Sequence, residues 1–365
     1  MSECVGLPSS LLGLESLRVS IAASIGECLV VEVCINRPQK LNALGAAFWR
    51  EFPLCMRTLD HWSPCRCVIL TGEGPAFCSG IDLSFLQLSS SSPPPSSSYS
   101  HSHSHFSSSS SAAATAAAAG ASTGAHEQQQ RKAHPQKKQQ QPAAAAAAAA
   151  ARGEEDPLVH IFPLPEEVGR RGLRLQQVVS LLQRATAAAE EIRKPVIAAV
   201  CGPCIGAGVG LLCACDIRLA AADAAFCVKE IDLGLPPDTG VLQRLPLLVR
   251  SSSWAREVCL STRFFFAAEA EKEGFVSAVY PDKETLINAA VSLGLTLAQK
   301  SPLAIAAAKQ ALNYSRGRPI EEGLQQQIAA SALLLQTRDI FDSICMQTKH
   351  KNQTKRTKLP PFAGL

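Results

Sequence analysis

The sequence predicts an α/β core followed by a helical C-terminal region. Short β-rich runs occur at 29–35, 68–71 and 195–200, and each is bounded by turn residues. Helical patterns separate these runs, and from about residue 254 to 346 the pattern is mainly helical. Strands that alternate with helices are typical of parallel β-α-β units, and the long helical stretch predicts an α-helical appendage.

The first predicted unit covers residues 17–86. The run LVVEVCI (29–35) predicts a strand, and VILT (68–71) predicts another that ends at Gly72. Between them, residues 43–59 carry apolar side chains at helical spacing, although Pro53 weakens or kinks that helix. A strand, a helix and a strand of this length predict a βαβ unit.

The second predicted unit begins near residue 157. A helical pattern at 173–192 is followed by the strand PVIAAV (195–200) and the turn CGPCIGAG. The helix then continues through 211–215, AAFCVKE predicts a short strand, and a helix is expected at 239–248, interrupted by Pro246.

The segment between these units is of low complexity. It contains a Ser/Pro run, the cluster HSHSH (101–105), a Gln/Lys tract and two alanine tracts. Such a composition buries too little apolar area to offset the entropy of ordering, so we expect a disordered insert in a surface loop. Metal binding by the three histidines is the weaker alternative. The expected boundaries are an N-terminal tail (1–16), a core (17–87 and 157–260), the insert (88–156), a helical region (261–346) and a basic tail (347–365).

Composition excludes several classes of protein. With 365 residues, 47% of them hydrophobic, the chain is long enough for one large domain or two small ones. A net charge of +4 gives no reason to expect nucleic acid. Apart from polyalanine, no apolar run is long enough to predict insertion in a membrane.

The cysteines and the termini bear on the compartment. Most of the 14 cysteines stand inside apolar runs, which favours a reduced intracellular protein. Cys201 and Cys204 form a C-x2-C pair without a second ligand pair, so packing is the simpler interpretation and no metal is expected. The N-terminus is not typical of a secretory signal and only weakly resembles a transit peptide, and the C-terminal FAGL is not an S-K-L signal.

Two glycine-rich turns each follow an apolar strand. GPAFCSGIDL (74–83) follows VILTG, and CIGAGVG (204–210) follows PVIAAV and opens a helix. Glycine allows the backbone close to a ligand, and a helix N-terminus offers unpaired N–H groups. Each turn alone is more often a packing turn, but two such N–H groups converging on one thioester oxygen would form an oxyanion hole.

The segment KEIDLGLPPDTG (229–240) holds three carboxylates. Glu230, Asp232 and Asp238 are candidates for proton transfer. Because Gly234, Pro236 and Pro237 exclude one continuous helix, a loop must bring Glu230 and Asp238 together. The alternatives are surface charges, or a cap on the next helix in the case of Asp238.

At this point the chain resembles the enoyl-CoA hydratase/isomerase, or crotonase, superfamily. The resemblance rests on NRPQKLNAL, AFCSGIDL, the stretch KPVIAAVCGPCIGAGVGLLCACDIR and KEIDLGLPPDTGVLQRLP. Within the superfamily it is strongest to the Δ(3,5)-Δ(2,4)-dienoyl-CoA isomerases. It covers about 17–86 and 170–345, and it implies a crotonase-like spiral of ββα units with a C-terminal α-helical trimerisation region.

The resemblance also implies roles for particular residues. The thioester oxygen would accept hydrogen bonds from the backbone N–H groups of Ile81 and Ala207. Glu230 would be the base that removes a proton next to the thioester, and Asp238 the acid that returns one at the far end of the conjugated system. The remaining substrate or CoA contacts would be Lys40, Gly80, Asp82, Leu83 and Gly206. Lys40 has an equally good interpretation as a solvated side chain.

The function implied is conversion of 3,5-dienoyl-CoA to 2,4-dienoyl-CoA in fatty-acid β-oxidation. No cofactor is expected, since coenzyme A is part of the substrate, and a homotrimer or homohexamer is implied. The compartment would be the mitochondrion or peroxisome by resemblance, with the cytoplasm open. The alternatives are a Δ3-Δ2-enoyl-CoA isomerase or a related acyl-CoA enzyme, and a non-catalytic acyl-CoA-binding protein.

One departure bears on the reaction. Gly210 stands where the hydratases carry a second glutamate and the dienoyl isomerases an aspartate. Losing that carboxylate disfavours hydration, and we expect Gly210→Asp to leave isomerase activity unchanged or to raise it. Ala207 replaces the middle glycine of its turn, which preserves the N–H provided that its φ is negative.

Overall fold

The computed structural model describes residues 6–85 and 167–350, and a mixed β-sheet forms the centre of this part of the chain. Within those residues the sheet has six strands in the order β1-β2-β3-β4-β6-β9. β1 is antiparallel to β2, and every following pair is parallel. The strands are β1 (Leu17–Ile25), β2 (Cys28–Ile35), β3 (Cys65–Gly72), β4 (Val196–Val200), β6 (Ile217–Ala221) and β9 (Ala278–Tyr280).

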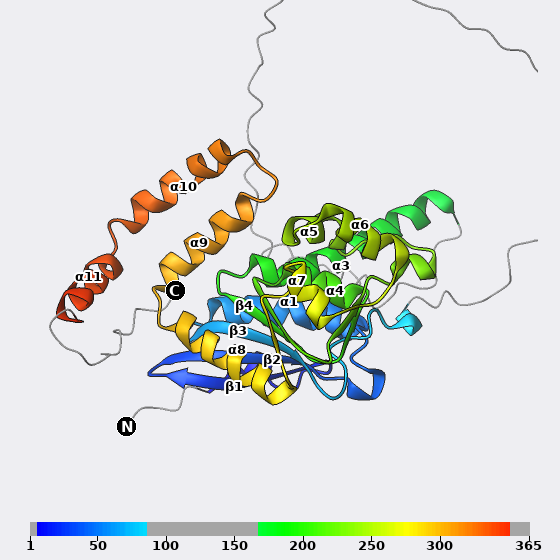
Figure 1. Ribbon diagram of the computed structural model, residues 1–365, viewed down its shortest axis with the longest axis horizontal. Helices are drawn as coiled ribbons and strands as arrows, with labels where there is room; N and C mark the ends of the chain where they lie inside the picture. The colour runs from blue at the N-terminus through cyan, green and yellow to red at the C-terminus, as the bar shows by residue number, and fades with distance from the viewer. Residues whose placement is uncertain (1–5, 86–166, 351–365) are drawn as a thin grey trace, which may run out of the picture. The chain divides into compact units, whose positions relative to one another are not determined.

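Both faces of this sheet are buried. Alternate side chains of β2, such as Val31 and Val33, belong to one apolar cluster with α1 (Ala46–His61), α3 (Val168–Glu191) and α4 (Ala207–Ala214). Val30 points to the other cluster, which α8 (Lys283–Ala298) covers, as Figure 1 shows. A Cβ built on Gly294 of α8 would lie 2.8 Å from Val30 Cγ1, so glycine lets α8 approach the sheet closely. Burial on both faces explains why these strands are continuous apolar runs.

The remaining elements surround this core. A smaller sheet has the order β5-β7-β8, formed by β5 (Pro203–Ile205), β7 (Ala225–Cys227) and β8 (Phe265–Phe266). The short 3-10 helices are η1 (Ser9–Leu11), η2 (Pro38–Lys40), η3 (Leu83–Phe85) and η4 (Glu230–Leu233). The other helices are α5 (Val241–Leu248), α6 (Ser252–Ser261), α7 (Ala267–Lys272), α9 (Pro302–Tyr314), α10 (Ile320–Leu334) and α11 (Arg338–His350).

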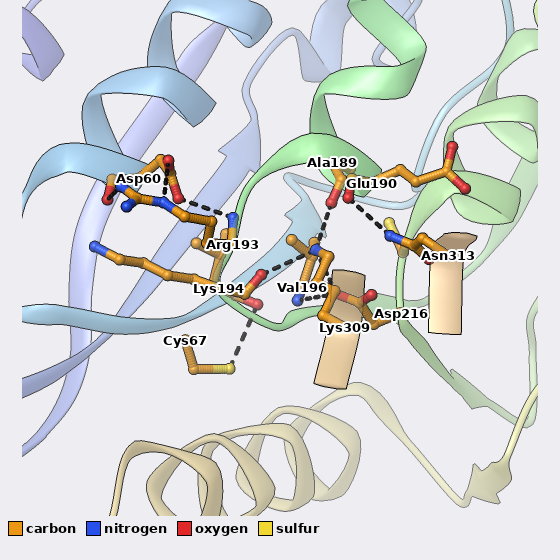
Figure 2. Close-up of polar contacts among 12 residues, drawn as sticks. Asp60, Cys67, Ala189, Glu190, Arg193, Lys194, Val196, Asp216, Lys309 and Asn313 are labelled. Atoms are coloured by element: carbon orange, nitrogen blue, oxygen red, sulfur yellow. Dashed lines mark hydrogen bonds and ion pairs between the residues drawn. The ribbon is translucent and has the colours of Figure 1, made fainter. Parts of the chain in front are cut away.

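A buried lysine attaches α9 to the core. Lys309 Nζ lies 2.7 Å from the Asp216 carboxylate and donates to the carbonyl oxygens of Ala189 and Lys194, as Figure 2 shows. Asp216 also accepts from the backbone N–H of Val196 at the start of β4. One ammonium group therefore joins α9 to the end of α3, the start of β4 and the turn after α4.

The predicted strands at 29–35, 68–71 and 195–200 are confirmed as β2, β3 and β4, and the βαβ unit around α1 has the expected parallel pairing. The helix expected at 239–248 begins two residues later, at Val241. α1 continues through Pro53, with Phe52 and Cys55 buried on either side. The insert (88–156), its histidine cluster and most of the basic tail lie outside the described residues.

Candidate active site

Two loops that leave the carboxyl ends of β3 and β4 lie side by side. Cys78 and Cys204 form a parallel bridge, and the N–H of Ile205 donates to the Cys78 carbonyl at 2.9 Å. Gly80 has a φ of +99°, and a Cβ there would lie 3.3 Å from the Ile205 carbonyl oxygen. Glycine is therefore required at position 80 both by conformation and by this close approach.

This pairing leaves two backbone N–H groups without a described acceptor. The Gly80 carbonyl and the Asp82 N–H both bond to Leu44, so the N–H of Ile81 between them faces the other way. Ala207 is the first residue of α4, where a helix has no internal partner for its N–H. Among the described residues, neither the Ile81 N–H nor the Ala207 N–H donates a hydrogen bond.

Gly206 sets the direction of the Ala207 N–H. It takes a φ of +53° and donates its own N–H to the Cys227 carbonyl at 2.8 Å. Ala207 is not among the described residues with positive φ, so the condition set for it from the sequence is met. The N-terminus of α4 adds a partial positive charge that favours an anion at this point.

Polar side chains fix the loop that carries Ile81. The Asp82 carboxylate forms an ion pair with Arg37 at 3.1 Å and accepts from the Ser84 hydroxyl at 2.6 Å. These hydrogen bonds, the one from Ser84 first, hold the pKa of Asp82 below its usual value. Asn42 donates to the carbonyl oxygens of Glu73 and Ala76. Since its carboxylate is occupied in this way, Asp82 supports the loop rather than presenting a free group to a substrate.

Glu230 lies next to Gly206, at the N-terminus of α4. It follows β7 and opens η4, and its Oε1 would lie 3.5 Å from a Cβ on Gly206. Both carboxylate oxygens are buried and have no hydrogen-bond partner among the described residues. Burial raises the pKa of Glu230, and the neighbouring charge of Asp238 raises it further.

Asp238 lies in the loop that returns from η4. Gly234 reverses the chain with a φ of +74°, and Gln183 of α3 donates to the Asp238 carbonyl at 2.8 Å. Burial raises the pKa of the half-buried Asp238 carboxyl. Its alternative as a helix cap is not realised, because Gly240 is the N-cap of α5 and no side chain caps that helix. The loop therefore brings two carboxyl groups with raised pKa values within electrostatic reach of each other.

The third candidate carboxylate, Asp232, contacts Lys229 and Thr262. Asp232 forms an ion pair with Lys229 and accepts from the Thr262 hydroxyl at 2.7 Å. The hydrogen bond from Lys229 is the main reason that its pKa is lowered. Asp232 therefore behaves as a surface anion, unlike Glu230.

Thr239 occupies the space next to Gly210. A Cβ on Gly210 would lie 2.5 Å from Thr239 Oγ1 and 3.4 Å from Val241 Cγ2. An aspartate at 210 would therefore displace Thr239, and we reverse the expectation that Gly210→Asp preserves or raises activity. Thr239 and Gln183 could not be selected from the sequence, because only the folded loop brings them next to α4 and Asp238.

The other predicted contact residues differ in their exposure. Lys40 is exposed at the end of η2, and Leu83 is exposed at the start of η3. Gly80 and Gly206 are buried and shape the two turns. In the described ranges, no group of three His, Cys, Asp or Glu side chains is arranged to hold a metal ion, and no helix is both long and apolar enough to cross a membrane.

Comparison with known proteins identifies the family. The model of the enoyl-CoA hydratase/isomerase family matches residues 26–125 and 166–353. The chain belongs to the enoyl-CoA hydratase/isomerase family, as the motifs around Ile81, Ala207 and Glu230 predicted.

Similar curated proteins carry a more specific name. The mitochondrial Δ(3,5)-Δ(2,4)-dienoyl-CoA isomerase of Rattus norvegicus is 32% identical over 93% of this chain and 83% of its own length. The human mitochondrial enzyme of the same name is 32% identical over 92% of this chain and 80% of its own length. The peroxisomal enzyme of that name from Arabidopsis thaliana is 31% identical over 87% of this chain and 89% of its own length.

Solved structures support the fold. The enoyl-CoA hydratase of Bacillus anthracis superposes with a TM-score of 0.64 at 22% identity, covering 95% of this chain and all of that one. The enoyl-CoA hydratase of Mycobacterium smegmatis gives a TM-score of 0.63 at 19% identity, over 92% of this chain and 96% of that one. The predicted crotonase-like α/β fold with a C-terminal helical region is confirmed.

Proposed function

We propose that this protein is an isomerase that converts 3,5-dienoyl-CoA to 2,4-dienoyl-CoA in the β-oxidation of unsaturated fatty acids. The observation that supports this most directly is the pairing of Glu230 and Asp238, two carboxyl groups with raised pKa values, beside two unpaired backbone N–H groups. The names of the curated relatives support the same reaction.

In the proposed reaction the thioester oxygen accepts from the N–H groups of Ile81 and Ala207. Ionised Glu230 removes a proton from the carbon next to the thioester, and the resulting dienolate carries its negative charge on the oxygen. These two donors stabilise that charge. Stabilisation of a developing negative charge by fixed donors is usually the largest single contribution to the rate acceleration in reactions of this kind.

Protonated Asp238 then returns a proton to the far end of the conjugated system. The double bonds move from positions 3 and 5 to positions 2 and 4, and no atom is gained or lost. Glu230 now holds the proton and Asp238 is ionised, so proton exchange resets the pair. Burial raises the pKa of both carboxyl groups, and the charge of Asp238 raises that of Glu230 further, so both hold a proton more readily than a free carboxyl group does.

Hydration is disfavoured by the same geometry. The hydratases of the family, as the sequence resemblance implies, position water between two glutamates, and position 210 is glycine here. The volume beside Gly210 is filled by the Thr239 side chain. A second carboxylate on this face of α4 is therefore missing, which leaves isomerisation as the better supported reaction.

For assembly and compartment we propose a homotrimer, or a hexamer made of two trimers, in the organelle where β-oxidation takes place. Several large apolar side chains of the C-terminal helices are exposed in the single chain, among them Leu324, Ile328, Leu333 and Phe341. Packing against other subunits would bury them. The relatives that carry the isomerase name are mitochondrial or peroxisomal, which supports either of those compartments.

An ultraviolet assay tests the proposed reaction. Isomerisation of 3,5-dienoyl-CoA brings the diene into conjugation with the thioester, so absorbance at long wavelength rises, and we expect turnover with this substrate. Turnover only of a 3-enoyl-CoA would indicate a Δ3-Δ2-enoyl-CoA isomerase. No spectral change at high protein concentration, combined with measurable acyl-CoA binding, would indicate a binding protein and overturn the proposal.

A further inference from the structure

The hydroxyl group of Thr239 is buried without a partner beside the catalytic carboxylates. The residue is 3% exposed, and its Oγ1 has no hydrogen-bond partner among the described residues. A buried hydroxyl without a partner is costly, and a valine of similar shape would avoid that cost. The observation therefore calls for a ligand or a bound water at this point.

The hydroxyl lies beside the first turn of α4, as does the Glu230 carboxylate. A Cβ on Gly206, the N-cap of α4, would lie 3.5 Å from Glu230 Oε1, and a Cβ on Gly210, the fourth residue of α4, would lie 2.5 Å from Thr239 Oγ1. The N–H of Gly210 donates to the Gly206 carbonyl at 3.3 Å, so the two glycines are joined across this turn. One water molecule can bridge two polar groups that lie beside the same turn.

We propose that Thr239 is a positioning residue for Glu230, and that its hydroxyl holds a water that donates to the Glu230 carboxylate. Three buried oxygens without partners, one from Thr239 and two from Glu230, give such a water the two or three polar contacts that it needs. The absence of side chains at Gly206 and Gly210 leaves room for this arrangement next to α4. The inference deepens the proposed function, since it assigns how the base of that reaction is oriented.

The other titratable groups near Glu230 do not provide this contact. Asp238 interacts with Glu230 through its charge, and no hydrogen bond joins the two carboxyl groups among the described residues. The thiols of Cys204, Cys227 and Cys259 also lie within electrostatic range, and burial raises the pKa of each, to about 11 for Cys259. They remain neutral at physiological pH and are weak donors.

The test compares Thr239→Val with Thr239→Ser and the matched control Thr296→Val. Thr296 is an exposed residue of α8, and its hydroxyl donates to the Ser292 carbonyl within the same helix. For each protein the pH at which Glu230 takes up its proton is read from the pH dependence of unfolding, by comparison with the same protein carrying Glu230→Gln. Thr239→Ala removes the same hydroxyl and replaces Thr239→Val if that variant does not fold.

Loss of a donor to a carboxylate raises its pKa, so Thr239→Val should shift the protonation of Glu230 to higher pH. Thr239→Ser should restore the pH at which Glu230 takes up its proton in the unmodified protein, and Thr296→Val should leave that pH unchanged. For the reaction, we expect Thr239→Val to lower kcat about tenfold with a smaller change in KM, as for one hydrogen bond to a charged group, and to move the acid limb of the kcat profile to higher pH.

An unchanged titration of Glu230 in Thr239→Val would overturn the assignment and leave Thr239 as a space-filling side chain. This measurement needs only the folded protein. If the unmodified protein fails to turn over 3,5-dienoyl-CoA, the proposed function fails, and the titration still decides whether Thr239 acts on Glu230.

Discussion

At the scale of single residues, Glu230 has the properties of a group placed for function at the expense of stability. Its carboxylate oxygens are buried and have no hydrogen-bond partner in the described part of the chain, and burial together with Asp238 raises its pKa. Such a group contributes stability that is fully present below its ordinary pKa and is lost as the pH rises through its raised pKa in the folded protein. At pH values above that raised pKa the folded protein bears the cost of ionising Glu230.

We expect Glu230→Gln to raise the free energy of unfolding at pH 7, because a neutral amide is cheaper to bury than a carboxylate. The gain should shrink at acidic pH, where Glu230 is protonated in both the folded and the unfolded protein. Denaturant titrations at the two pH values measure this difference. A variant that is no more stable than the unmodified protein at pH 7 would contradict this description of the Glu230 environment.

Gly210 and Thr239 should behave as a coupled pair. A methyl group at 210 would lie 2.5 Å from Thr239 Oγ1, so Gly210→Ala should cost about 1–3 kcal/mol, the usual range for overpacking. In a Thr239→Ala background that oxygen is gone, and the same substitution should cost much less. Thermal unfolding of the two single variants and the double variant measures the coupling. Additive effects would show that the two positions do not compete for the same space.

At the scale of elements, the contact between α9 and the core includes the buried ion pair of Lys309 with Asp216, beside the hydrogen bond from Asn313 to the Glu190 carbonyl. Burial raises the pKa of Asp216, and Lys309 opposes that effect. Lys309→Met removes the charge and keeps most of the volume, which leaves the Asp216 carboxylate buried and unpaired.

We expect Lys309→Met to lower the free energy of unfolding by about 3–5 kcal/mol, as for other broken buried pairs. The double variant Lys309→Met with Asp216→Asn should recover much of that loss, since the amide oxygen still accepts from Val196. Denaturant unfolding of the three variants measures these effects. A small loss for Lys309→Met alone would mean that α9 is held mainly by its apolar contacts.

The sequence predicted best those features that depend on a single strand or turn. The apolar runs of β2, β3 and β4 were recognisable because a strand buried on both faces carries mostly apolar side chains. β9 and β8 were missed because they have three and two residues, too few to show a period. For the site, the two glycine turns could be located because each follows a strand. Thr239 could not be located, because the residue that it contacts, Gly210, lies on a different element, α4.

At the scale of the whole molecule, the C-terminal helices present apolar side chains that one chain does not cover. Leu324 and Ile328 stand one turn apart on α10 and are 61% and 59% exposed. We expect light scattering to give a mass of three times, or six times, the 38.7 kDa of the monomer. Leu324→Asp combined with Ile328→Asp should shift the protein toward monomers, because the charges would be buried in a subunit interface. An unchanged mass for this variant would place the interface elsewhere.

The proposed mechanism requires Glu230 to remove one proton from the substrate and Asp238 to return another. The most direct measurement is the initial rate of 3,5-dienoyl-CoA isomerisation, followed by absorbance, for Asp238→Asn beside the matched control Asp232→Asn. Asp232 is an exposed carboxylate of the same segment, paired with Lys229. We predict that Asp238→Asn loses about 10²–10⁴ of the rate, the range for a positioned acid or base, while acyl-CoA affinity changes little and Asp232→Asn stays close to the unmodified protein. A near-normal rate for Asp238→Asn would contradict the account and remove Asp238 from the mechanism.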